Sequence, residues 1–443
     1  MTTDSESYYD FENVEGIVPI ANDLPCSFIF DQREIRGRAK ISLDLKNRGG
    51  IKIDVGCDPT QLSKISFPND DIKEIILNNH KIRVFVSNIR PDPIGIGLTF
   101  TPNIEPIQFL GDDNTKISKI IFHLFNFKDS KGTARKLVST SEFETSRAVT
   151  ELISNEWKIE LHHFSLSKKS ENPLHLTHIG YVSKVDDSQF DGKTAHEILA
   201  NLYWFFSFCQ ATFCSPVLPI GIDPSGKTVW LQANSPRKSD SGELSWFDPH
   251  HSEELSQLFP KFLSIANNEK WGDTLHHAIY WYVRSNNSSG TGIDSGIILT
   301  QVAIERLGYE YAVNQRRLIE SKGFKDLKAS DKFRLLFSSL DLPIDISDST
   351  PKIKSVAEKF GYIDNPHFLT DVRNSLVHPD HKRQKDFSTL YYDTWRLGLW
   401  YLELAILKIC DYHGTYANRL TDGLWVGQVE CVPWDKRKDG EDS

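Results

Sequence analysis

The chain has 443 residues, of which 39% are hydrophobic and 25% are charged, as in a folded globular protein with two or three domains. Its net charge of −9 excludes a surface that coats nucleic acid over its whole extent. The acidic start lacks the apolar core of a secretory signal, and no stretch reaches the ~18 uncharged apolar residues of a membrane span. The six cysteines show no CxxC spacing, so neither a zinc site nor a disulfide framework is indicated. We expect a cytoplasmic protein without a membrane partner.

The first half of the chain alternates hydrophobic and polar residues with a period of two, which is typical of half-buried β-strands. The clearest run is 38–46, and similar runs occupy 51–55, 82–86, 117–127 and 157–161. Polar turn sequences separate these runs. One helix interrupts them at about 194–213, and its aromatic stripe fits a core better than a cofactor site. The pattern predicts an antiparallel sandwich or barrel with one long helix.

Beyond a polar loop at 234–242, the hydrophobic period changes to 3.6, the period of amphipathic helices. Apolar stripes predict helices near 255–266, 275–283, 298–307, 330–341, 351–360, 366–378 and 387–412. The fold class is therefore α+β, with a β-rich half followed by an all-α bundle. We place a β-rich sensor or regulatory region at 1–245, undivided or split into two subdomains near 150. The bundle follows at 246–430, with a flexible tail at 431–443.

Residues 221–228 match the phosphate-binding P-loop pattern G-x4-G-K-[ST]. Such a loop functions between a strand and a helix, because the helix N-terminus supplies amide donors to the phosphates. Here the following residues, 229–233, are β-like, and two prolines precede the match. The sequence favours a β-hairpin and leaves a P-loop NTPase using Lys227 and Thr228 as the weaker alternative. We predict no metal and no cofactor elsewhere.

A second motif lies at the end of a predicted helix and reads Asp-Val-Arg-Asn-Ser-Leu-Val-His-Pro over 371–379. Pro379 disfavours helical geometry at His378, so the helix should end there. Arg373 lies five residues before His378, about 140° around the helix and about 7.5 Å along it. Asn374 lies one turn before His378 and can hydrogen-bond the imidazole or a ligand oxygen.

These three residue types suit the cleavage of a phosphodiester. Histidine transfers protons near neutral pH, and arginine binds phosphate oxygens and stabilises transition-state charge. With an RNA 2′-hydroxyl as nucleophile, no metal is required. Basic or protonatable residues that could hold flanking phosphates follow at His381, Lys382, Arg383 and Lys385. The spacing alone favours surface residues with a C-capping histidine, because Arg and His often fall five residues apart.

The segment from Arg373 to Pro379, on the penultimate helix of an α bundle, resembles the signature of the HEPN superfamily, which is Arg, four to six residues, then His. The resemblance implies a metal-independent endoribonuclease in which two copies of the motif face each other in a dimer or higher oligomer. The layout, with a helix over 300–307 and a β-rich first half, resembles ApeA-type HEPN proteins of bacterial anti-phage defence. This implies an abortive-infection or toxin effector that cleaves RNA, tRNA included, after a phage-derived trigger engages the N-terminal half.

Two acidic residues are candidates for supporting roles. Glu305 can face the cleft, or it can pair with Arg306 at a solvated face, and Asp371 can position Arg373. The first alternative function is a non-catalytic HEPN module that binds nucleotide or RNA or dimerises. Residues 250–443 contain 24 basic and 27 acidic residues, so positive charge for RNA must be local, and resting affinity should be weak and salt-sensitive.

Overall fold

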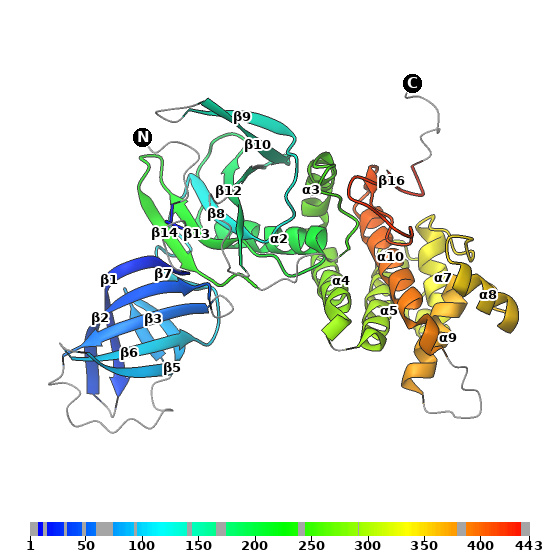
Figure 1. Cartoon of the computed structure of the whole chain (residues 1–443), viewed down its shortest axis with the longest axis horizontal. Helices are drawn as coiled ribbons and strands as arrows, with labels where there is room; N and C mark the ends of the chain where they lie inside the picture. Colours follow the sequence, from blue (N-terminus) through cyan, green and yellow to red (C-terminus); the bar gives the residue numbers. More distant parts are fainter. Residues whose placement is uncertain are drawn as a thin grey trace. The chain divides into compact units, whose positions relative to one another are not determined.

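The computed structural model describes residues 8–11, 16–30, 33–46, 50–58, 74–92, 95–139, 144–164, 174–237, 244–290, 292–378 and 387–435. It confirms the α+β class (Figure 1). The chain forms two compact units, the first from residues 1–203 and 214–239 and the second from 204–213 and 240–443. The boundary at 239–240 falls in the predicted polar loop. In the described part of the chain, every helix is too short or too polar to cross a bilayer.

The first unit begins with a closed antiparallel barrel whose strands run in the order β1-β2-β3-β6-β5-β4. The strands are β1 (Ile17–Phe30), β2 (Arg33–Asp44), β3 (Gly50–Cys57), β4 (Glu74–Leu77), β5 (His80–Asp92) and β6 (Gly95–Pro102). The alternating apolar residues point inward, as Ile41, Ile53 and Phe100 do, and fill the interior with a hydrophobic core. Closure leaves the barrel without an unpaired edge.

An eight-stranded antiparallel sheet follows, in the order β7-β14-β13-β8-β12-β11-β10-β9. Its strands are β7 (Ile107–Leu110), β8 (Lys119–Phe125), β9 (Ala134–Ser139), β10 (Glu144–Ile153), β11 (Trp157–His163), β12 (Leu176–Lys184), β13 (Val217–Ile222) and β14 (Thr228–Ala233). The change from barrel to open sheet lies between Pro102 and Ile107. The division suggested near residue 150 instead falls inside β10, which is paired on both sides.

The predicted long helix is α2 (Gly192–Gln210), and it starts where the Asp191 carboxylate accepts the Thr194 amide at 2.9 Å. Its C-terminal part belongs to the second unit. There Phe205 packs edge-on against Phe259 and Phe262, with ring centroids 5.3 Å apart in each pair. The aromatic stripe is therefore core, as predicted.

The second unit is helical. Its helices are α3 (Glu253–Ala266), α4 (Trp271–Asn286), α5 (Ile293–Tyr309), α6 (Ser321–Asp326), α7 (Ala329–Ser339), α8 (Pro351–Phe360), α9 (Asn365–Val377) and α10 (Tyr391–Ile409). The central helix is α5, which packs against α4, α7, α9 and α10. A π-helical turn, η2 (Glu310–Gln315), continues α5.

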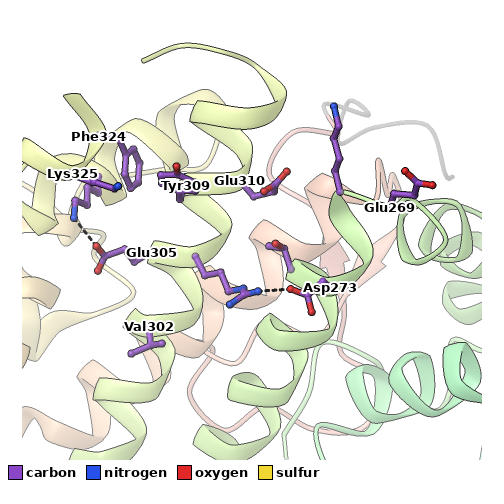
Figure 2. Close-up of a pocket in the computed structure, with 12 residues that line it drawn as sticks. Glu269, Asp273, Val302, Glu305, Tyr309, Glu310, Phe324 and Lys325 are labelled. Carbon is purple, nitrogen blue, oxygen red and sulfur yellow. Dashed lines mark hydrogen bonds and ion pairs between the residues drawn. The ribbon is translucent and has the colours of Figure 1, made fainter. Parts of the chain in front are cut away.

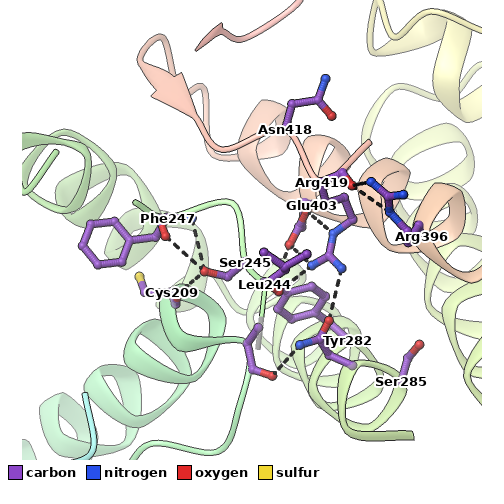
Figure 3. A network of polar contacts seen from close by, with 12 residues as sticks. Cys209, Leu244, Ser245, Phe247, Tyr282, Ser285, Arg396, Glu403, Asn418 and Arg419 are labelled. Carbon is purple, nitrogen blue, oxygen red and sulfur yellow. Dashed lines mark hydrogen bonds and ion pairs between the residues drawn. The ribbon is translucent and has the colours of Figure 1, made fainter. Parts of the chain in front are cut away.

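After α10, the chain packs back onto the helices through a buried ion pair (Figure 3). The Arg419 guanidinium donates to Glu403 on α10 at 2.8 Å, to Asn286 on α4 at 3.2 Å and to the carbonyl of Leu244 at 2.8 Å. Tyr282 donates its hydroxyl to the same Glu403 carboxylate. Burial, with the charge of Glu403, raises the pKa of Tyr282 well above its usual value, which keeps that donor protonated.

The chain remains packed up to residue 435. Strands β15 (Thr415–Tyr416) and β16 (Glu430–Cys431) pair with each other. Val432 is buried, and the Trp434 indole donates to the carbonyl of Tyr412 at 2.7 Å. The prediction of a flexible tail from residue 431 is therefore wrong for 431–435, because Trp434 and Val432 anchor it. Residues 436–443 lie outside the described part of the chain.

A buried carboxyl group lies at the start of α3. Glu254 accepts hydrogen bonds from the Thr415 hydroxyl at 2.8 Å and from the Asp248 amide at 3.2 Å. Burial raises its pKa from 4.5 to about 9 despite these donors. The folded state therefore binds this proton more tightly than the unfolded state, and stability falls as pH rises from about 4.5 to about 9.

We expect Glu254→Gln to remove most of this pH dependence, because the amide reproduces the neutral acid. At pH 8 the variant should be more stable than the parent by about 5 kcal/mol, and at pH 4 the two should be nearly equal. Urea unfolding at both pH values measures the difference, with the exposed neighbour substitution Glu253→Gln as control. If the parent and the Glu254→Gln variant lose equal stability between the two pH values, Glu254 is not the titrating group.

Candidate active site

The motif helix α9 is fixed at its start and its middle. The Asp364 carboxylate caps it by accepting the His367 amide at 2.8 Å, and Arg334 of α7 donates to the same carboxylate at 2.7 Å. Gln301 of α5 donates its amide to the carbonyl of Leu369 at 2.7 Å. The helix ends at Val377, and His378 has extended backbone angles, as its position before a proline predicts.

The structure brings Arg373 and Asn374 into contact. The guanidinium Nη1 of Arg373 donates to the side-chain oxygen of Asn374 at 3.3 Å, and both side chains are half-buried. The backbone carbonyl of Asn374 accepts the amide of His378 at 3.0 Å. The His378 imidazole is exposed and makes no hydrogen bond to any described residue. Arg373 and Asn374 thus form a pair, and His378 is joined to it through the backbone alone.

The two acidic residues predicted to support the motif have other partners. The Glu305 carboxylate accepts from Lys332 of α7 at 2.6 Å, inside a groove whose described lining does not include Arg373, Asn374 or His378 (Figure 2). Asp371 accepts the Tyr362 hydroxyl. The described partner of Glu305 is therefore a lysine on the neighbouring helix and not a motif residue, and its supporting role stays a prediction. Residues His381, Lys382, Arg383 and Lys385 lie outside the described part of the chain.

The P-loop match is a β-hairpin, in which β13 pairs with β14 through Gly221 and Trp230. The Asp223 carboxylate accepts the amides of Ser225 and Lys227, both at 2.9 Å. The Ser225 hydroxyl, which also donates to this carboxylate at 2.6 Å, and the two amides hold the pKa of Asp223 below its usual value. A P-loop would turn such amides toward phosphate and continue into a helix. Strand β14 follows instead, so the alternative of a P-loop NTPase is wrong.

Sequence reasoning missed the groove that contains Glu305. It lies between α4, α5, η2, α6 and α7 and has a volume of about 630 Å³. Glu310 at its wall is buried, although it follows an ordinary amphipathic helix in the sequence. The i,i+4 spacing of Arg306 and Glu310 was the one sequence signal for this groove. It was not specific, because such charged pairs are common on solvated helix faces. Among the described residues, no group of three or more His, Cys, Asp or Glu is placed to hold a metal ion.

Comparisons with known proteins match part of each unit. The family described as the YopA central domain matches residues 112–243, and the YopA C-terminal domain matches residues 268–431. The SPbeta prophage-derived uncharacterized protein YopA of Bacillus subtilis is 30% identical over 340 residues, which are 74% of this chain and 75% of that protein. No solved structure matches the chain.

Proposed function

This chain belongs to the YopA family, and we propose that its helical unit is a metal-independent endoribonuclease of the HEPN type. The observation that carries the proposal is the contact between Arg373 and Asn374 at the accessible end of α9, with His378 one turn beyond it. This end of the helix presents a guanidinium, an amide and an imidazole. Among the described residues, no carboxylate contacts any of these three groups. A phosphodiester fits this chemistry better than a cationic substrate does.

The proposed reaction is an internal displacement at phosphorus. His378 takes the proton of the RNA 2′-hydroxyl, and the oxygen attacks the adjacent phosphorus to form a 2′,3′-cyclic phosphate. The bond from phosphorus to the 5′-oxygen breaks, and that oxygen takes the proton that His378 now holds, so it leaves as a 5′-hydroxyl and His378 becomes neutral again. Arg373 stabilises the charge on the phosphoryl oxygens, and Asn374 orients the guanidinium through the hydrogen bond it accepts.

A second copy of the chain completes the site in this proposal. In one copy, the imidazole of His378 lacks a described orienting partner, and it is not among the described lining residues of the groove in the helical unit. Exposed apolar side chains lie at Val377, the last residue of α9, and at Tyr392, in the first turn of α10. Two motifs facing each other would double the local positive charge, which a chain of net charge −9 requires for RNA.

We place this activity in the cytoplasm, under the control of the β-rich unit. The relative in Bacillus subtilis is described as prophage-derived, which supports a role in conflicts involving phages. A phage-derived trigger acting on the first unit would release the nuclease. Because no described residue orients the His378 imidazole, one alternative is also supported. In this alternative, the helical unit is a non-catalytic HEPN module that binds RNA or nucleotide, or dimerises.

The test is to incubate the purified full chain with total RNA and with tRNA in EDTA, alone and with lysate from phage-infected cells. We expect cleavage in EDTA, with fragments that end in 2′,3′-cyclic phosphate and begin with 5′-hydroxyl. Sedimentation should show a dimer or larger species. RNA binding without cleavage under both conditions would favour the non-catalytic alternative.

A further inference from the structure

An aromatic segment near the start of the chain, residues 8–11, packs against the eight-stranded sheet of the first unit. It reads Tyr-Tyr-Asp-Phe and belongs to no helix or strand. Its side chains alternate, because Tyr9 and Phe11 are 5% and 8% exposed, whereas Tyr8 and Asp10 are exposed. Two buried anchors that are separated by one exposed residue are the pattern of an extended peptide bound along one side.

The two anchors lie against ring side chains of β8. The ring centroid of Tyr9 lies 5.6 Å from that of His123. The ring centroid of Phe11 lies 5.1 Å from that of His123 and 5.8 Å from that of Phe125. Aromatic pairs at such distances contribute to binding beyond the area that they bury, so His123 and Phe125 form a floor that favours aromatic side chains.

The sheet alone holds this floor in place. Strand β8 pairs with β12 on one side and with β13 on the other. His123 is fully buried, and its Nδ1 lies 3.1 Å from the carbonyl oxygen of Val217 on β13, which orients the ring. Histidine is less often fully buried than the aliphatic residues that line most core faces. Because neighbouring strands position His123 and Phe125, residues 8–11 are not required to shape the floor.

Residues 8–11 differ from the strands around them in how they are held. The strands are joined by ladders of backbone hydrogen bonds, and residues 8–11 are in none of these ladders. Their described contacts with the sheet join side chains, including a 3.1 Å contact between the hydroxyls of Tyr8 and Thr228 at the start of β14. A segment of another protein with the same spacing of aromatic residues can make the same ring contacts.

We propose that residues 8–11 are an internal ligand, and that the site beneath them binds an extended segment of another protein with two aromatic side chains separated by one residue. The first ring takes the place of Tyr9 on His123, and the second takes the place of Phe11 on His123 and Phe125. The partner and residues 8–11 exclude each other, so the site is closed until the partner displaces them. This binding is independent of the proposed nuclease motif.

The test is a titration of full-length proteins with a fluorescent synthetic peptide of residues 5–14. The double variant Tyr9→Ser, Phe11→Ser lacks both anchors and should bind the peptide at least about tenfold more tightly than the parent. In the parent, the tethered residues 8–11 compete at an effective concentration on the order of millimolar. A peptide with the same two substitutions should not bind. The control variant Phe85→Ser, at a 51% exposed position on β5, should bind as weakly as the parent.

A crosslink locates the site, and a milder variant covers the case in which the double variant does not fold. A peptide with photoreactive benzoylphenylalanine in place of Phe11 should crosslink to the first unit at β8. Phe11→Leu keeps an apolar side chain but removes the ring contacts, so it should bind the peptide at least about threefold more tightly than the parent.

Three results would overturn the proposal. The first is that neither folded variant binds the peptide up to about 1 mM. The second is that the parent binds the peptide as tightly as the variants do. The third is that the peptide crosslinks to the helical unit instead of the first unit.

Discussion

His378→Ala is expected to reduce RNA cleavage by at least about 100-fold, because proton transfer by a positioned side chain contributes about 10²–10⁴-fold to such reactions. The imidazole is exposed and bonded to no described residue, so its removal should leave the fold unchanged. The measurement is the initial rate of cleavage of a labelled RNA by equal amounts of parent and variant. Thermal unfolding of the two proteins should give the same midpoint.

The matched control for this experiment is His413→Ala. His413 is also an exposed histidine of the helical unit, 55% exposed at its side chain, and it pairs with Asp411. The proposal expects this variant to cleave RNA at the parental rate. Cleavage by His378→Ala at the parental rate would exclude the proposed mechanism. If the unmodified protein binds RNA but does not cleave it, the non-catalytic alternative is supported.

The sequence predicted most of the secondary structure because hydrophobic period is a local signal. Period two located β2, β3, β5, β8 and β11, and period 3.6 located the helices from α3 to α10 except the short α6. The end of α9 was predictable because Pro379 restricts the backbone of the residue before it. The hairpin at 221–233 was also predictable from a local preference. The sequence Asp223-Pro224-Ser225-Gly226 favours a tight turn through its own residues, independently of distant contacts.

What the sequence did not predict depends on contacts between distant segments. The partner of Glu305 is Lys332, 27 residues away on another helix. The division of the strands into a barrel and an eight-stranded sheet depends on which strands pair, and alternation of residues does not encode that choice. The groove that contains Glu305 forms only where α4, α5, η2, α6 and α7 come together. Local patterns thus placed the motif on its helix but did not identify its neighbours.

The buried ion pair between Arg419 and Glu403 should dominate the stability of the helical unit. Both side chains are at most 1% exposed, and Arg419 joins α10, α4 and the segment at Leu244. Arg419→Met should lower the free energy of unfolding by about 3–5 kcal/mol, because it leaves the Glu403 carboxylate buried without a cation. Urea unfolding followed by tryptophan fluorescence measures the loss, with the exposed substitution Arg284→Met on α4 as control.

The double variant Arg419→Met, Glu403→Gln separates the cost of an unpaired charge from the loss of contacts. Glutamine keeps an acceptor for the Tyr282 hydroxyl but carries no charge, so the double variant should be more stable than Arg419→Met alone by at least about 1 kcal/mol. If the double variant is instead the less stable of the two, Glu403 tolerates burial without Arg419. In that case the hydrogen bonds from Arg419 to Asn286 and Leu244, and not its charge, hold the C-terminal segment against the helices.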